Sequence, residues 1–156
     1  MVAENNLFVT IQKIDKDTEA AAALLEFVKN FSWDAVKEHT IRVIRNWEFE
    51  DWETPFAATA DGCIVGMATI MKSDYYPLPE IYPWISTLFV SEAYRGYRIS
   101  EKLIDFANAY AKNIGFDHTY IPSEHVGLYE KYGYRYIKDI INYGGDADRL
   151  YAKKLR

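Results

Sequence analysis

The chain has a single cysteine, no long apolar run and no block of basic residues. Cys63 is the only cysteine among 156 residues, which excludes an internal disulfide and fits a reducing cytoplasm. No apolar run approaches the ~20 residues that span a bilayer. The N-terminus also lacks the basic segment and apolar core of a secretory signal. We therefore expect a cytoplasmic protein with no membrane partner.

Positive charge and metal-ligating residues are also scarce. The net charge is −5 and the basic residues are scattered, which disfavours nucleic-acid binding through phosphates. The histidines, His39, His118 and His125, lie far apart without metal-ligand spacing, so we expect no metal site. What the chain does have is 49% apolar and 16% aromatic residues, which is typical of a globular protein. Its length predicts one domain, residues 1–156, with a sizeable core.

Hydrophobic periodicity predicts an alternation of strands and helices. Strands are expected at Leu7–Ile14, Phe56–Ala60, Cys63–Met71, Ile85–Val90, His118–Ile121, Tyr134–Ile140 and Leu150–Lys154. Helices are expected from Asp15 or Asp17 to about Asn30, after a Ser32 cap as far as Trp47, and at Ser100–Asn113. A fourth helix, which carries Tyr129, is expected after a Ser123 cap and would end at Gly133. The segment Asp74–Pro83 holds three prolines, so it must be irregular, and it is a candidate substrate-facing loop.

The most informative stretch joins the strand Ile85–Val90 to the helix that follows it. Between them lies a polar turn in which Arg95 and Arg98 flank Gly96. Free backbone N–H groups and the positive end of the macrodipole at a helix start favour a phosphate. The two arginines add charge-assisted donors. The alternative is a basic surface turn that only caps a helix.

This turn resembles the acetyl-CoA loop of the GNAT N-acetyltransferase family, which reads Gln/Arg-x-x-Gly-x-Gly/Ala between a strand and a helix. Arg95 fills the first position, while Arg98 and Ser100 stand where the two glycines are usual. The resemblance implies acetyl-CoA as cosubstrate. It also implies that the backbone of the central strand bonds the pantetheine and polarises the thioester carbonyl. The cofactor-binding residues it implies are Leu88, Phe89, Val90, Arg95, Gly96, Tyr97, Arg98, Ile99 and Ser100.

Two further segments carry the same resemblance. Leu128–Tyr134 is similar to the family's Leu/Phe-Tyr-Glu-Lys-x-Gly-Phe/Tyr segment, which implies that Tyr129 faces the departing thiolate of CoA. Alone, Tyr129 would be interpreted as one core aromatic among thirteen tyrosines. Glu80–Ser86 resembles the Pro-Trp entry to the central strand. The implied fold is a single-domain α/β (α+β) GNAT fold. Its central sheet is mixed and mostly antiparallel, with about six to seven strands flanked by about four helices.

Acetylation of an amine requires a proton acceptor. A lysine-like amine of pKa ~10.4 is about one part in 10³ neutral at pH 7, an obstacle of ~4.6 kcal/mol. Many family members place a glutamate on the strand after the long helix, but His118–Ile121 has no carboxylate. Glu80 is therefore our first candidate for the base, followed by Asp74, Glu124 and His125. For each of them the alternative is an exposed loop residue or a packing residue.

The acceptor is defined only by class. Trp33, Tyr82 and Trp84 are predicted to line its pocket, although large aromatics more often lie in cores. The leading hypothesis is an acetyl-CoA-dependent N-acetyltransferase that acts on a primary amine of a small molecule or peptide by direct attack on the thioester. The alternatives are a catalytically weak CoA-binding or sensing domain, and an α/β nucleotide-phosphate binder that has converged on an arginine-rich loop. The tyrosine-rich C-terminal hairpin permits a homodimer.

Overall fold

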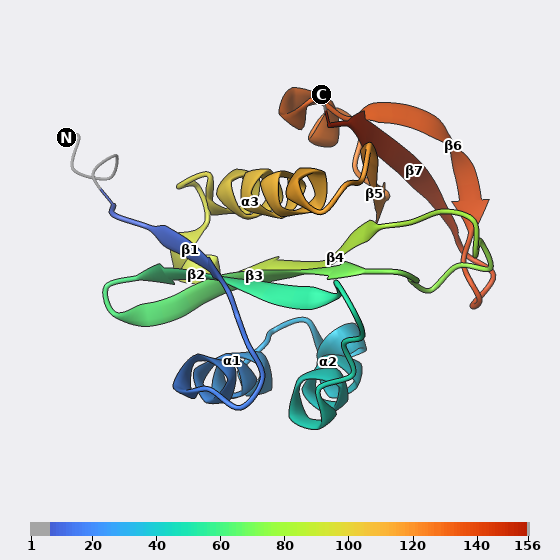
Figure 1. Ribbon diagram of the computed structural model, residues 1–156. Coiled ribbons are helices and arrows are strands. Elements are labelled where there is room, and N and C mark those ends of the chain that lie inside the picture. The colour runs from blue at the N-terminus through green and yellow to red at the C-terminus, as the bar shows by residue number, and fades with distance from the viewer. Residues whose placement is uncertain (1–6, 156) are drawn as a thin grey trace.

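Seven strands form one sheet in the order β1-β2-β3-β4-β5-β7-β6 in the computed structural model, which describes residues 7–155 (Figure 1). Strands β4 and β5 run parallel, and every other neighbouring pair is antiparallel. The mixed, mostly antiparallel sheet predicted from the sequence is confirmed. The strands are β1 (Thr10–Lys13), β2 (Thr54–Ala60), β3 (Cys63–Met71), β4 (Trp84–Val90), β5 (His118–Ser123), β6 (Arg135–Ile141) and β7 (Ala147–Lys154).

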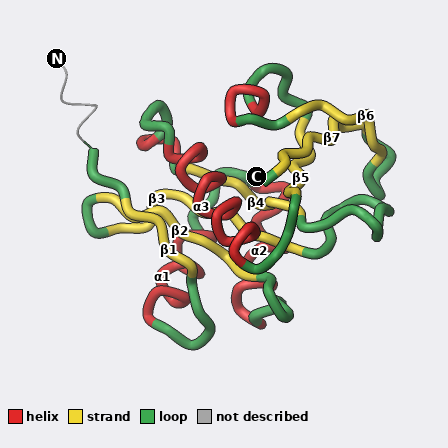
Figure 2. Tube along the Cα trace, turned by 45° about the horizontal axis from the view of Figure 1, so that its top comes forward, coloured by secondary structure: helices red, strands yellow, loops and turns green. Residues whose placement is uncertain are grey.

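Three α-helices cover the two faces of the sheet. Helix α3 (Ile99–Asn113) lies on one face, and α1 (Glu19–Lys29) and α2 (Asp34–Asn46) lie on the other (Figure 1). Figure 2 shows from a second direction that the β6–β7 hairpin stands at the end of the sheet away from β1. Within residues 7–155, no helix is long and apolar enough to span a membrane.

Each face of the sheet has its own core. On the α3 side, Leu103 and Ile104 pack in a buried cluster that includes Ile85 of β4. On the α1 and α2 side, Leu24 packs in a separate cluster that includes Phe89, also of β4. Strict alternation would put Ile85 and Phe89, four residues apart, on the same face of the sheet. The register of β4 shifts between them, near Thr87, and this bulge turns Phe89 to the opposite face, so β4 contributes to both cores.

The fourth predicted helix does not form. The Tyr129 segment is instead a single 3₁₀ turn, η3 (Tyr129–Tyr132), and the Ser123 hydroxyl accepts from the backbone N–H of His125 at 3.0 Å rather than capping a helix. Gly127 has a φ of 92°, which an α-helix cannot accommodate. Strand β5 also extends to Ser123, so too little chain remains for a helix before the turn.

The other helices begin at slightly different residues from those expected. The hydroxyl of Thr18, rather than a carboxylate of Asp15 or Asp17, caps α1 by accepting from Ala21 N–H at 3.1 Å. Helix α2 begins at Asp34, so the residue at its N-cap is Trp33 and not Ser32. These shifts of one to three residues leave the order of the elements unchanged.

Candidate active site

Strands β4 and β5 diverge and leave one edge of β4 open. The only described pairing between them joins Trp84 to Tyr120, so past Trp84 the backbone groups of β4 that face β5 have no strand partner among residues 7–155. The register of β4 with β3 shifts in the same stretch, and Thr87 there has a φ of 50°. Positive φ is strained for a β-branched residue, and such strain concentrates at functional sites. Leu88–Val90, which the family resemblance implies would bond the pantetheine, lie along this open and bulged edge.

The loop after β4 presents a helix start without a side-chain cap. The chain passes through the 3₁₀ turn η2 (Glu92–Tyr94) and then enters α3, with Gly96 at a φ of 95° and Arg98 at 63°. Arg98 therefore takes the left-handed conformation, at a cost of about 1 kcal/mol for a residue that is not glycine. No side chain caps α3, so its first backbone N–H groups are available to an anion.

The loop side chains differ in what they can offer a cofactor. The Arg98 Nε donates to Glu101 Oε1 at 2.7 Å, and its side chain is 77% exposed. The Arg95 Nε donates to the carbonyl oxygen of Val90 at 2.9 Å. Ile99 is 2% exposed, so it can present only its backbone. Residues 96–98 and the start of α3 line a groove of about 420 Å³.

A hydrogen bond brings the two sequence motifs together. The hydroxyls of Ser100, at the start of α3, and Tyr132, in η3, lie 3.4 Å apart. Tyr129, at the other end of the same turn, is 8% exposed and packs against the ring of Tyr151. Burial raises the pKa of Tyr129, and the neighbouring Tyr132 acts in the same direction. The Tyr129 phenol therefore stays protonated at neutral pH, so it can donate a hydrogen bond but cannot serve as a base.

The four candidate bases lie in different environments. Glu80 is exposed in the loop between β3 and β4, and its side chain forms no hydrogen bond or ion pair within residues 7–155. Glu124 and His125 are exposed beyond the end of β5. Asp74 is half-buried, and its carboxylate accepts from the hydroxyl of Ser86 on β4. Of the four, Asp74 is the one that is bonded to β4.

The three aromatic residues predicted to line one acceptor pocket do not gather. Trp84 is fully buried in a cluster with Ile140 and Leu150 of the β6–β7 hairpin, so it cannot line an open pocket as expected. The large apolar surface of an indole explains this burial. Tyr82 stacks on Trp52 with ring centres 6.5 Å apart, and Trp33 is exposed at the start of α2.

Sequence reasoning missed two polar residues close to Asp74. Ser86 bonds it directly, and Asp148 of β7 is close enough for its charge to act on Asp74. Ser86 could have been recognised, because it lies two residues after Trp84 and so shares its face of the strand. Asp148 carries no local signal, because its position depends on β7 pairing beside β5.

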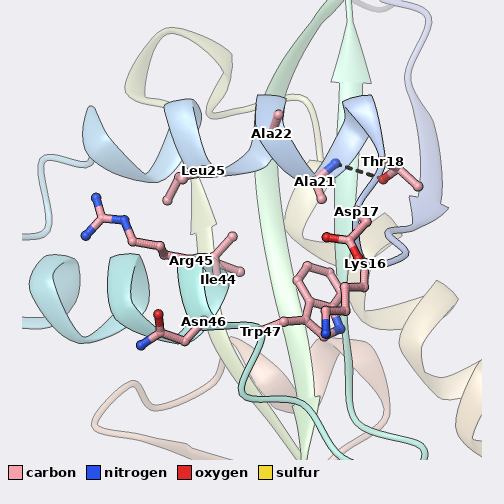
Figure 3. A pocket seen from close by; sticks show the side chains of 10 residues that line it. All are labelled: Lys16, Asp17, Thr18, Ala21, Ala22, Leu25, Ile44, Arg45, Asn46 and Trp47. Carbon is pink, nitrogen blue, oxygen red and sulfur yellow. Dashed lines mark hydrogen bonds between the residues drawn. The ribbon is translucent and has the colours of Figure 1, made fainter.

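A separate cavity of about 240 Å³ lies between α1 and the end of α2 (Figure 3). Its lining includes Lys16, Arg45 and Trp47, and all of it comes from residues 16–25 and 44–47. None of the lining belongs to β4, β5 or the loop before α3, so this cavity is distinct from the open edge of β4. In the described part of the chain, no group of three or more His, Cys, Asp and Glu residues could hold a metal ion.

Comparison with solved structures supports the same fold. The chain superposes on the aminoglycoside 6'-acetyltransferase type Ii with a TM-score of 0.74 at 16% identity, covering 94% of this chain and 97% of that one. The aminoglycoside 6'-N-acetyltransferase from Enterococcus faecium gives 0.71 at 15% identity, with the same coverages of 94% and 97%. The GNAT family N-acetyltransferase YhbS from Escherichia coli, in complex with CoA, gives 0.70 at 17% identity, covering 96% of this chain and 83% of that one.

Sequence comparison gives the family. A search of curated protein sequences finds no match. The model of the acetyltransferase (GNAT) family, however, matches residues 19–134, from the start of α1 to the end of the Tyr129 segment. This span includes the open edge of β4, the uncapped start of α3 and the turn that carries Tyr129. With the motifs, the sheet and the family model in agreement, the chain belongs to the acetyltransferase (GNAT) family.

Proposed function

We propose that the protein is an N-acetyltransferase that moves the acetyl group of acetyl-CoA to a primary amine by direct attack on the thioester. The observation that carries this proposal is the open, bulged edge of β4 beside the uncapped start of α3, with the Tyr129 turn bonded to that helix through Ser100 and Tyr132. Residues 1–156 would form one N-acetyltransferase domain. The fold and the family support the proposal.

The residues present fit acetyl-CoA. The backbone N–H groups of Ile99 and Ser100, with the guanidinium groups of Arg95 and Arg98, would hold the pyrophosphate. Gly96 and Tyr97 would shape the same loop. Free N–H groups of the strand segment Leu88–Val90 would bind the pantetheine and the thioester oxygen. An oxyanion donor of this kind is worth ~3 kcal/mol. The Tyr129 hydroxyl would stabilise the departing sulfur.

The acceptor we propose is a cationic small-molecule or peptide amine. The net charge of −5 favours the approach of a cation. Two of the three solved structures described above are named as aminoglycoside acetyltransferases, so aminoglycosides belong in any test panel. The cytoplasm is the compartment we propose, because Cys63 is free and exposed. A homodimer remains a prediction.

Release of CoA from acetyl-CoA tests the proposal. The panel should contain aminoglycosides, polyamines, free peptide N-termini and lysine peptides. We expect at least one amine to raise the rate of CoA release well above hydrolysis. If the protein binds CoA but no amine raises the rate of CoA release from acetyl-CoA, the CoA-sensing alternative is supported instead. Competition by ATP, but not by CoA, would support a nucleotide-phosphate binder.

Removing the guanidinium of Arg98 should weaken acetyl-CoA binding. Arg98→Ala loses one charge-assisted contact with the pyrophosphate, which should cost ~1.5–3 kcal/mol, or roughly 10- to 150-fold in affinity. The melting temperature should stay nearly unchanged, because arginine and alanine are about equally strained at this positive φ and the Arg98 side chain of the ion pair with Glu101 is exposed. Calorimetric titration with acetyl-CoA measures the effect.

Glu101→Gln is the matched control for Arg98→Ala. It removes the ion-pair partner of Arg98 but keeps the guanidinium. Affinity should be retained or improved, because Arg98 is then free to turn toward the phosphates. Unaltered affinity in Arg98→Ala would place this side chain outside the cofactor site.

A further inference from the structure

Asp74 is bonded to the central strand although it lies in the loop that follows β3. Its carboxylate accepts from the backbone N–H of Tyr75 at 2.6 Å and from the hydroxyl of Ser86. Ser86 immediately precedes Thr87, the strained residue at the bulge of β4, and Leu88 follows. The carboxylate is thereby fixed next to the strand segment that would carry the thioester.

A second carboxylate lies near Asp74, and neither has a basic partner in an ion pair. The hydroxyl of Tyr76, in the same loop, donates to Asp148 Oδ2 at 2.6 Å. The ion pairs formed within residues 7–155 include neither Asp74 nor Asp148. Half-buried carboxylates without a counter-ion are costly, so a cation from solution would stabilise them.

The surroundings raise the pKa of Asp74. Burial is the main cause, and the charge of Asp148 adds to it, while the bonds from Ser86 and Tyr75 and the charge of His39 act in the opposite direction. A carboxylate with a raised pKa is a stronger base near neutral pH than an ordinary aspartate.

Trp84 anchors the loop that carries Asp74 on this side of β4. It lies two residues before Ser86, so the two side chains share a face of the strand. The indole is fully buried and stacks on Tyr76 with ring centres 5.4 Å apart. Its Nε1–H has no hydrogen-bond partner within the described residues. The buried indole thus holds Tyr76, whose hydroxyl bonds Asp148, against β4, and it supports the two carboxylates without itself contacting the acceptor.

We infer that Asp74, positioned by Ser86, binds the ammonium group of the acceptor and takes its proton. The inference rests on the proposed function. Asp74 removes one proton, and the nitrogen lone pair then attacks the carbonyl carbon. The C–N bond forms and the C–S bond breaks. The nitrogen loses a second proton, the sulfur of CoA gains one with help from Tyr129, and Asp74 returns its own to water. Asp74 is then the base, in place of the exposed Glu80 that the sequence favoured for this role.

The test is the pH dependence of acetyl-CoA turnover with the best amine of the panel. Asp74→Asn removes the base, and Glu80→Gln makes the same charge change in the same loop. Ser86→Ala keeps Asp74 but removes the hydroxyl that donates a hydrogen bond to its carboxylate. Affinity for CoA, measured for each variant, shows whether the cofactor site is intact.

We expect Asp74→Asn to lower kcat/KM roughly 10²- to 10⁴-fold near neutral pH. Because a base must be unprotonated, wild-type kcat/KM should fall as pH drops through the pKa of Asp74, and this limb should vanish in Asp74→Asn. The deficit should shrink at high pH, where the amine is already neutral. The kcat/KM of Ser86→Ala should fall less than that of Asp74→Asn, and its fall at low pH should remain. Glu80→Gln should have the kcat/KM and the pH profile of the wild type.

Four outcomes would overturn the inference. A wild-type rate and pH profile in Asp74→Asn would exclude Asp74 while leaving the proposed function intact. A base-like deficit in Glu80→Gln would return the role to Glu80. If no amine stimulates the wild-type protein, the proposed function fails and the inference fails with it. If Asp74→Asn does not bind CoA, Ser86→Ala decides: a wild-type kcat/KM there contradicts the positioning of Asp74.

Discussion

Replacing Tyr129 by phenylalanine is expected to lower acetyl-CoA turnover roughly 10- to 10³-fold, because assistance to the departing thiolate is partial rather than obligatory. A tyrosine of pKa ~10 facing a thiol of pKa ~8.5 makes full proton transfer mildly uphill, by ~2 kcal/mol, so a hydrogen bond can provide much of the effect. The raised pKa of Tyr129, caused mainly by burial, strengthens this expectation. Steady-state turnover under conditions where chemistry limits the rate measures the change.

Tyr132→Phe is the matched control for Tyr129→Phe. It removes a hydroxyl from the same 3₁₀ turn, and that hydroxyl makes a long hydrogen bond of 3.4 Å with the Ser100 hydroxyl. Its effect on turnover should be much smaller, and affinity for acetyl-CoA should survive in Tyr129→Phe. Unchanged turnover in Tyr129→Phe would show that Tyr129 is a core aromatic. The catalytic assignment would then fail even if the acetyltransferase proposal stood.

Leu103→Ala is expected to lower the free energy of unfolding by about 2–5 kcal/mol. Leu103 is fully buried on the face of α3 that packs on the sheet. A Cβ atom added to Gly66 of β3 would lie only 3.3 Å from Leu103 Cδ1. Leu103 therefore packs closely against β3, and the surrounding residues can only partly fill the cavity that alanine would leave. Urea denaturation followed by circular dichroism measures the loss.

Lys102→Ala provides the reference for Leu103→Ala. Lys102 is exposed on the same helix, so its replacement should change the free energy of unfolding by less than about 0.5 kcal/mol. A loss in Leu103→Ala no larger than this would mean that α3 is not packed on the sheet through Leu103. The orientation of the loop before α3, which we propose to bind the pyrophosphate, would then lose its physical basis.

The elements around the central strand could be predicted from the sequence because their signals are local. The apolar run of β4 and the three-and-four periodicity of α3 are each complete within a few residues of the loop that joins them. The expected helix at Tyr129 was wrong because its apolar spacing ignored Gly127, whose positive φ breaks the segment. Periodicity alone therefore overstates helices near glycine.

The surroundings of Asp74 could not be predicted in the same way. The relation of Asp74 to Asp148 depends on β7 lying between β5 and β6, an order that no short motif encodes. The burial of Trp84 likewise depends on the β6–β7 hairpin that covers it. Glu80 ranked first because it stands nearest the central strand in sequence, whereas Asp74 is the residue that folds back onto that strand.

Transfer of a labelled acetyl group is the most direct test of the central claim. The protein is incubated with acetyl-CoA carrying carbon-13 in the acetyl group and with the amine that gives the fastest CoA release, and the products are identified by mass spectrometry. The account predicts one labelled N-acetyl amine for each CoA released and no label on the protein. Label recovered as free acetate, or bound covalently to the protein as an intermediate, would contradict direct transfer from the thioester to the amine.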